Sequence, residues 1–145
     1  MSELGATMEA MAAHLQAALP SRQVTDSWLD ISMRQSSELI AGVITVIFLG
    51  ESDYPNYVGR EAQFGTCDVL LIGQLEVSPI PKQDEGGRLV ALAEFDMSEE
   101  IKEWTKGNLG GWPAGVSQML LTGLRWSGQK EAPRGWVAAT LQVQL

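Results

Sequence analysis

The chain has 145 residues, of which 45% are hydrophobic, and a formal net charge of −8. This length suits one domain with its own apolar core, so folding requires neither a disulfide framework nor a structural metal. The acidic balance, with ten scattered Lys and Arg, argues against a nucleic-acid-binding surface. The first predicted element is a helix over residues 2–19, where apolar residues recur at helical spacing until Pro20.

Three strands are expected before a second helix. The first is a short strand over about residues 23–31, where aspartates interrupt the apolar pattern. The second covers residues 39–49, a β-branched run typical of a central strand that is covered on both faces. The third is the apolar run of residues 65–77, in which Gly73 indicates a bulge or a close backbone approach.

The second predicted helix begins near Leu89 and ends before Gly107, a suitable terminator. Its apolar stripe consists of Leu89, Leu92, Ala93, Met97, Ile101 and Trp104. Charged residues such as Glu94 fall off this stripe, so we expect them in solvent.

Two final strands, residues 116–126 and 136–145, are joined by a turn and predict an antiparallel hairpin. The second of them alternates cleanly between apolar and more polar residues. The sequence therefore predicts one α+β domain over residues 1–145. It has one mixed, mainly antiparallel sheet with two helices packed on it, in the order α-β-β-β-α-β-β.

Residues that carry chemistry are scarce. The only histidine is His14 and the only cysteine is Cys67, so catalytic Cys/His or Ser/His/Asp sets and metal-binding spacings have almost no material. Cys67 lies in an apolar run, and we interpret it as a small buried hydrophobe. The glycine-rich segment 107–115 lacks Gly-Lys-Ser/Thr and precedes a strand, unlike a phosphate-binding loop. We predict that the protein is not an enzyme and has no cofactor or metal.

The candidate functional residues are instead interface residues. Residues 51–64 read as a long loop whose tyrosines either contact a partner or fold back onto the sheet. Loop tryptophans are frequent interface residues, although each can also cap a sheet. Loop position and residue type select six candidates for protein contacts: Tyr54, Tyr57, Arg60, Trp112, Lys130 and Arg134. Two further tryptophans, Trp126 and Trp136, are interpreted as packing across the terminal hairpin.

The location is also constrained by composition. The first residues lack the positive charge of a secretory signal, and the longest apolar stretch, residues 39–49, is too short for a membrane-spanning helix. A single cysteine gives no sign of an oxidising compartment. We therefore expect a protein of the cytoplasm, or of a particle assembled there, and no contact with a membrane.

Four segments together resemble the tail terminator, or tail completion, proteins of long-tailed bacteriophages. The first is the opening helix, which ends in Ala17-Ala18-Leu19-Pro20, and the second is the apolar strand of residues 42–49. The third is the strand of residues 68–72, which leads through Pro81-Lys82-Gln83-Asp84 into the amphipathic helix. The fourth is the terminal pair, residues 119–126 and 137–145. The resemblance covers nearly the whole chain as an order of elements, and it includes no catalytic motif.

The resemblance implies a virion protein at the head-proximal end of the tail, assembled in the host cytoplasm. Such proteins form a hexameric ring that caps the tail tube protein, stops its polymerisation and presents a surface to the head connector or neck protein. DNA passes through the central hole. An acidic subunit fits this role, because a lumen without phosphate-neutralising lysines lets DNA slide without specific binding. Segment 109–115, rich in glycine, departs from the family pattern.

Two alternatives stay open at this point. The first is another phage neck or tail component, such as a head-completion or tube subunit. A tube subunit needs a long β-hairpin arm, which only residues 51–64 could supply, and their sequence predicts a poor strand. The second is a small binding module or bacterial enzyme of unknown ligand, whose site would show as a deep pocket with converging polar groups.

Overall fold

A computed structural model of the chain describes residues 2–52, 56–57, 60–61 and 65–145. Within this part the chain builds a five-stranded sheet, a separate two-stranded pair, three α-helices and two short 3-10 helices. The α-helices are α1 (Glu3–Ala18), α2 (Ser36–Ala41) and α3 (Gly86–Thr105). The strands are β1 (Gln23–Thr25), β2 (Val43–Ser52), β3 (Asn56–Tyr57), β4 (Arg60–Glu61), β5 (Thr66–Glu76), β6 (Gln118–Trp126) and β7 (Arg134–Gln144). The 3-10 helices are η1 (Ile31–Met33) and η2 (Gln83–Glu85).

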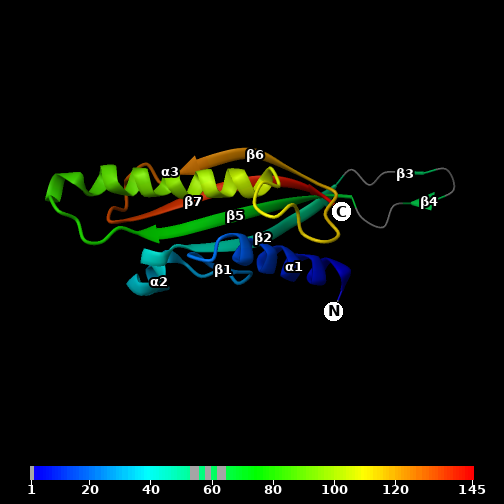
Figure 1. Ribbon diagram of the computed structural model, residues 1–145, viewed down its shortest axis with the longest axis horizontal. Coiled ribbons are helices and arrows are strands. Elements are labelled where there is room, and N and C mark those ends of the chain that lie inside the picture. The colour runs from blue at the N-terminus through cyan, green and yellow to red at the C-terminus, as the bar shows by residue number, and fades with distance from the viewer. Residues whose placement is uncertain (1, 53–55, 58–59, 62–64) are drawn as a thin grey trace.

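The five-stranded sheet has the order β1-β2-β5-β7-β6 (Figure 1). β1 and β2 run parallel, whereas the other three neighbouring pairs are antiparallel. The predicted α+β class with one mixed, mainly antiparallel sheet is therefore confirmed. The five strands of this sheet and the two long helices also follow one another along the chain in the predicted order.

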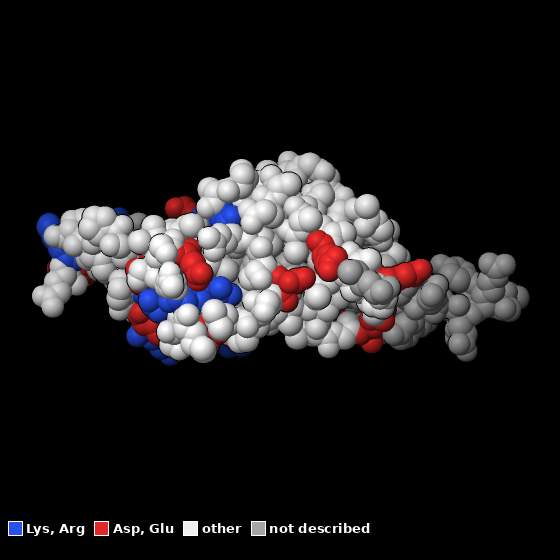
Figure 2. Space-filling model, turned by 90° about the horizontal axis from the view of Figure 1, so that it is seen from below, with Lys and Arg blue, Asp and Glu red and all other residues white. Residues whose placement is uncertain are grey.

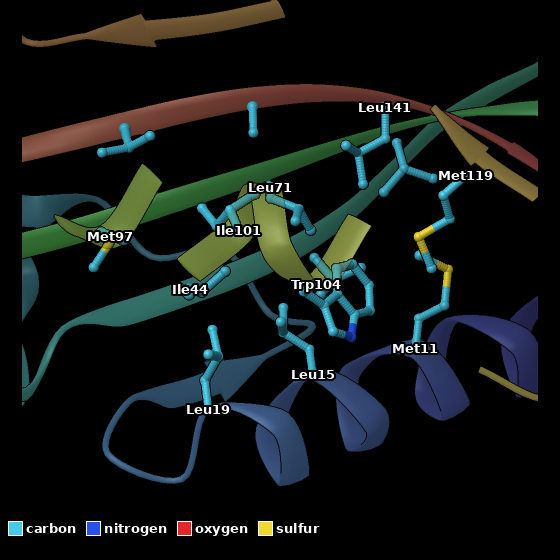
Figure 3. Close-up of a cluster of buried hydrophobic side chains, with 14 of the residues drawn as sticks. Met11, Leu15, Leu19, Ile44, Leu71, Met97, Ile101, Trp104, Met119 and Leu141 are labelled. Carbon is cyan, nitrogen blue, oxygen red and sulfur yellow. The ribbon is translucent and has the colours of Figure 1, made fainter. Parts of the chain in front are cut away.

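Both long helices cover the same face of the sheet, with α1 over β1 and β2 and α3 over β5, β7 and β6 (Figure 1). Their apolar faces meet above the central strands (Figure 3). There Leu15 of α1 and Ile101 of α3 lie with Leu71 of β5 and Leu141 of β7, all buried. Burying one such side chain contributes about 1.5–3 kcal/mol, so this layer stabilises the fold.

α1 agrees with its prediction. The Ser2 side chain accepts a hydrogen bond from the Gly5 N–H at 3.0 Å and caps the helix, as serine does at this position. Met11 and Leu15 are buried on the predicted stripe, and the helix ends at Ala18, two residues before Pro20.

α3 was predicted in the right place, but its buried face is rotated. Met97, Ile101 and Trp104 are buried as expected. Leu92 was placed on the stripe and is exposed, while Glu94 was expected in solvent and is 1% exposed. The buried positions near the start of the helix are taken by Val90 and Glu94 instead. A charged residue such as Glu94 is expected in solvent unless hydrogen-bond donors surround it. Its donors come from Ser127 and Trp136, which are distant in the sequence, so the helical pattern alone did not predict its burial.

The strand predicted over residues 39–49 begins four residues later. Leu39 is fully buried, but in the short helix α2, and Val43 is the first strand residue. Gly42 separates the two with a φ of 88°, a positive value that favours glycine. A short apolar run is buried in either conformation, so its composition alone does not distinguish them. α2 is thus a third helix in addition to the two predicted.

At Gly73 a side chain of α3 approaches closely, whereas the prediction was a bulge or a close approach of another backbone segment. A Cβ at this position would lie 2.1 Å from the Met97 sulfur, so any other residue here would force the Met97 side chain to move. The irregularities of the sheet lie elsewhere, between Phe48 and Gly50 in β2 and between Leu121 and Gly123 in β6. The first strand is also shorter than expected, since β1 covers only residues 23–25.

The two tryptophans of the terminal hairpin do not pack on each other, which corrects the prediction. Trp126 pairs with Val137, the neighbour of Trp136, so the two indoles lie on opposite faces of the sheet. Trp126 instead packs edge-on against Phe95 of α3, with ring centres 5.4 Å apart. Its indole N–H donates to the Ser98 hydroxyl at 2.9 Å.

Candidate interaction surfaces

One edge of the sheet is the strand β6. In the described part of the chain it pairs with β7 alone, so its other side presents free backbone groups. No charged residue occurs from Gln118 to Leu124, and Leu120 is 55% exposed. Proteins usually protect such an edge with charges or prolines, because a long apolar edge pairs with another strand. β6 therefore has the properties of a docking edge.

The opposite edge is open along part of β2. β1 covers only Val43 to Thr45, and among the described residues no strand pairs with the outer side of β2 beyond that point. Leu49 on this stretch is 61% exposed. The sheet therefore has two different open edges. Pairing between unlike surfaces is heterologous, and it produces a ring when the rotation closes.

A groove of about 410 Å³ adjoins the β6 edge, between that strand and the end of α3. Its lining consists of Lys102, Thr105, Lys106, Trp112, Met119, Leu120 and Leu121. The candidate residue Trp112 forms one wall, where its indole N–H donates to the Thr105 carbonyl at 2.9 Å. This bond fixes an otherwise exposed ring against the helix end. The structure therefore places Trp112 beside the open β6 edge.

Two other candidates come from the turn between β6 and β7. Lys130 is exposed in that turn. Arg134, the first residue of β7, makes internal contacts: its Nε lies 2.9 Å from a Glu76 carboxylate oxygen, and its Nη1 donates to the Ile31 carbonyl. Arg134 thus joins β5, β7 and the η1 segment.

The remaining candidates belong to residues 51–64. Tyr54 lies outside the described residues. Tyr57 and Arg60 oppose each other in the antiparallel β3–β4 pair, which stands beyond the end of the five-stranded sheet (Figure 1). The segment predicted as a loop and a poor strand therefore contains a short antiparallel strand pair. The six candidates do not form one site: Trp112 lies at the end of α3, and Tyr57 and Arg60 lie in the β3–β4 pair.

The single histidine has a structural position. His14 Nδ1 accepts a hydrogen bond from the indole N–H of Trp104 at 2.9 Å, so Nε2 carries the proton. Nε2 faces the Gly110 carbonyl at 3.2 Å and donates to it. His14 therefore connects α1, α3 and the glycine-rich segment after α3. Sequence spacing gave no signal of this link, because His14 and Trp104 are 90 residues apart.

The cysteine is buried, as predicted. Burial raises the pKa of the Cys67 thiol from its ordinary 9.0 to about 11, and the nearby Glu51 and Asp68 carboxylates add to this shift. A thiol that holds its proton is a poor nucleophile and metal ligand. In the described part of the chain no three His, Cys, Asp or Glu side chains gather in a group able to hold a metal ion.

This thiol predicts a loss of stability at alkaline pH. The folded state keeps the Cys67 proton, whereas the unfolded chain loses it from about pH 9, so raising the pH from about 9 to about 11 favours unfolding. Urea unfolding of the wild type and of Cys67→Ala across this range measures the effect. The wild type is expected to lose more stability per pH unit than the variant, and equal slopes would contradict the assignment.

Comparison of the sequence with models of protein families, and with curated proteins, finds no match. Among the described residues no helix has the length and apolarity needed to cross a membrane.

Sequence reasoning missed the two sheet edges as functional features. The absence of charge from Gln118 to Leu124 does not by itself indicate an edge, because buried central strands also lack charged residues. That β6 is an edge follows from its pairing with β7 alone, which no local pattern shows.

Proposed function

We propose that this protein is a structural subunit of a bacteriophage virion, with no enzymatic activity. It forms a hexameric ring at the head-proximal end of the tail, ends the polymerisation of the tail tube and joins the tube to the head connector. The order of helices and strands along the chain supports this proposal, since it agrees with the order on which the resemblance to tail terminators was based.

The observation that carries the proposal is the pair of unlike open edges. An apolar β6 edge with Leu120 exposed lies on one side of the sheet, and the outer stretch of β2 with Leu49 exposed lies on the other. In our proposal, β6 of one subunit docks against β2 of the next, and six such contacts close the ring. Backbone hydrogen bonds then supply the affinity, as in other cases of strand addition.

The charge distribution is compatible with this arrangement. α1, which lies on the β2 side of the sheet, contains Glu3 and Glu9 but no Lys or Arg. Viewed from that side, the surface is largely uncharged, with acidic side chains over its middle and basic ones gathered toward one end (Figure 2). Apolar contacts therefore need to offset the repulsion between subunits that each carry a charge of −8. DNA passing through an acidic lumen is not held there.

A tube subunit is the second candidate, because the β3–β4 pair stands beyond the sheet like the start of an arm (Figure 1). The two candidates differ in how assembly ends. A tube subunit polymerises into open tubes that electron microscopy of the purified protein reveals. A terminator stops at single rings and caps tubes made by another protein.

Leu120→Lys is expected to prevent ring formation. A lysine on the edge strand places a charge where the next subunit would pair, at little cost to a side chain that is already exposed. Light scattering after size exclusion, at high protein concentration, measures the mass. The wild type is expected at six times the subunit mass and the variant at the subunit mass.

Ile40→Lys is the matched control. Ile40 is 52% exposed on α2, outside the proposed contact, so this variant should form rings like the wild type. Circular dichroism checks that both variants fold. The proposal fails if the wild type is a monomer in solution and also forms no ring on assembled tail tubes. It also fails if the neighbouring reading frames encode no tail tube or connector protein.

A further inference from the structure

A second hollow lies on the face of the sheet opposite α1 and α3. The side chains of β5 and β7 alternate, so Ile72, Gln74, Trp136 and Ala138 point away from the helical layer. The residues before and within η1, together with the β6–β7 turn, border this patch. They enclose a cleft of about 310 Å³, the tryptophan cleft, whose lining is Trp28, Asp30, Ile31, Ile72, Gln74, Glu131, Trp136 and Ala138.

The two indoles of this cleft differ from the other three in the protein. Trp104, Trp112 and Trp126 each donate the indole N–H to a protein acceptor. In the described part of the chain, Trp28 and Trp136 make no such bond, and Trp28 is 48% exposed. Two indole rings, neither held by a hydrogen bond to the protein, therefore lie in one accessible cleft. Their π faces can contact a ligand.

The carboxylates of the cleft are negative and lack a cation of their own. Asp30 accepts hydrogen bonds from the Ser32 N–H at 3.0 Å and the Ser32 hydroxyl at 2.8 Å, which lower the pKa of Asp30 and keep it ionised. Glu131 is exposed in the turn. Among the described residues neither carboxylate has a Lys or Arg within ion-pair distance.

The cations near the cleft are mostly engaged elsewhere. Beneath the cleft the Arg34 Nε donates to Gln74 and its Nη1 lies 3.8 Å from Glu38, but its buried Nη2 has no partner among the described residues. Arg134 is paired with Glu76. Arg125 of β6 pairs with Ala138 of β7 and is exposed, but it does not line the cleft. The walls therefore combine two indoles, an aliphatic floor and two uncompensated negative charges.

We propose that the tryptophan cleft binds an arginine side chain presented by a partner polypeptide. A guanidinium stacks on indole faces and donates to two carboxylates at once, which an ammonium group does less well. Its aliphatic stem packs on Ile31, Ile72 and Ala138. The partner is a different protein, because a second copy of this chain carries the same net charge of −8 and is repelled. This inference does not depend on the ring contact, which uses the strand edges.

The test uses short peptides and the indole N–H signals of the five tryptophans in NMR spectra. Acetyl-Gly-Arg-Gly-amide is compared with the same peptide carrying citrulline, a neutral isostere of arginine. The arginine peptide is expected to shift the Trp28 and Trp136 signals, assigned with Trp28→Phe and Trp136→Phe, and to leave the Trp104 signal in place. The citrulline peptide should bind at least about tenfold more weakly, because citrulline has no positive charge and so loses both the cation–π contact and the charge pair.

Glu131→Gln removes one charge at an exposed position and should weaken arginine binding about three- to tenfold without affecting folding. Arg125→Gln, the matched control on the same face, should bind equally well or more tightly. Three results overturn the proposal: equal shifts by both peptides, shifts at Trp112 in place of Trp28 and Trp136, or indole shifts that appear on concentrating the protein without peptide. The last would assign the cleft to a second copy of this chain.

Discussion

Trp104→Ala is expected to lower the free energy of unfolding by about 3–5 kcal/mol, the usual cost of removing a large buried aromatic side chain. Trp104 is fully buried at the centre of the core, between Leu15 of α1 and the strands (Figure 3). Its removal also leaves His14 without the N–H that its Nδ1 accepts. The substitution therefore loosens the contact between α1 and α3 as well as the core.

Urea unfolding followed by circular dichroism measures this loss. Trp104→Phe separates the two contributions, because it retains most of the apolar volume but removes the indole N–H. Trp28→Ala is the control: Trp28 is about half exposed, so its removal should cost about 1 kcal/mol or less. If Trp104→Ala were no more destabilising than Trp28→Ala, the described core would be wrong.

Glu94→Ala is expected to destabilise the fold by about 3 kcal/mol. One carboxylate oxygen of Glu94 accepts three hydrogen bonds. The donors are the Ser127 hydroxyl, the Ser127 backbone N–H at 3.4 Å and the Trp136 backbone N–H at 2.9 Å. Gly135 lies directly below, since a Cβ there would come within 2.6 Å of the same oxygen. Alanine leaves these donors without a partner in a buried place, and unpaired buried donors are costly.

Glu94→Gln keeps the shape and one acceptor oxygen, so it should lose about half as much stability. Glu99→Ala is the matched control on the same helix, because Glu99 is exposed and, among the residues that the structure describes, pairs with Lys102 alone. Hydrogen exchange adds a local measurement: the backbone N–H of Trp136 should exchange faster in Glu94→Ala than in Glu99→Ala. Equal stability of the two alanine variants would contradict the proposed role of Glu94.

Glu94 also affects the proposed assembly. Its partners Ser127 and Trp136 flank the turn that connects β6 with β7, so this carboxylate fixes one end of the edge strand to α3. A docking edge needs a defined position, because strand pairing depends on register. We therefore expect Glu94→Ala to weaken ring formation indirectly, together with stability, whereas Leu120→Lys should affect ring formation alone.

Much of the fold followed from local patterns. The alternation of β7 identified its buried face, and the helical spacing of Met11 and Leu15 identified that of α1. Local rules failed where one residue type fits two structures, as for Leu39, which is buried in a helix and was expected in a strand. For the candidate site, the sequence selected Trp112, which does line a groove beside β6. It also selected Arg134, whose guanidinium makes internal contacts with Glu76 and the Ile31 carbonyl.

The sequence by itself determined the class of the fold and the shortage of catalytic groups, because periodicity and composition are properties of neighbouring residues. Only the tertiary structure decided which strands are edges, that Glu94 is buried, and that Trp28 and Trp136 share a cleft. Each of these depends on contacts between distant residues: Glu94 meets Ser127 and Trp136 from 33 and 42 positions away. A charged side chain is stable in the interior only when such donors surround it, and no local pattern reports them.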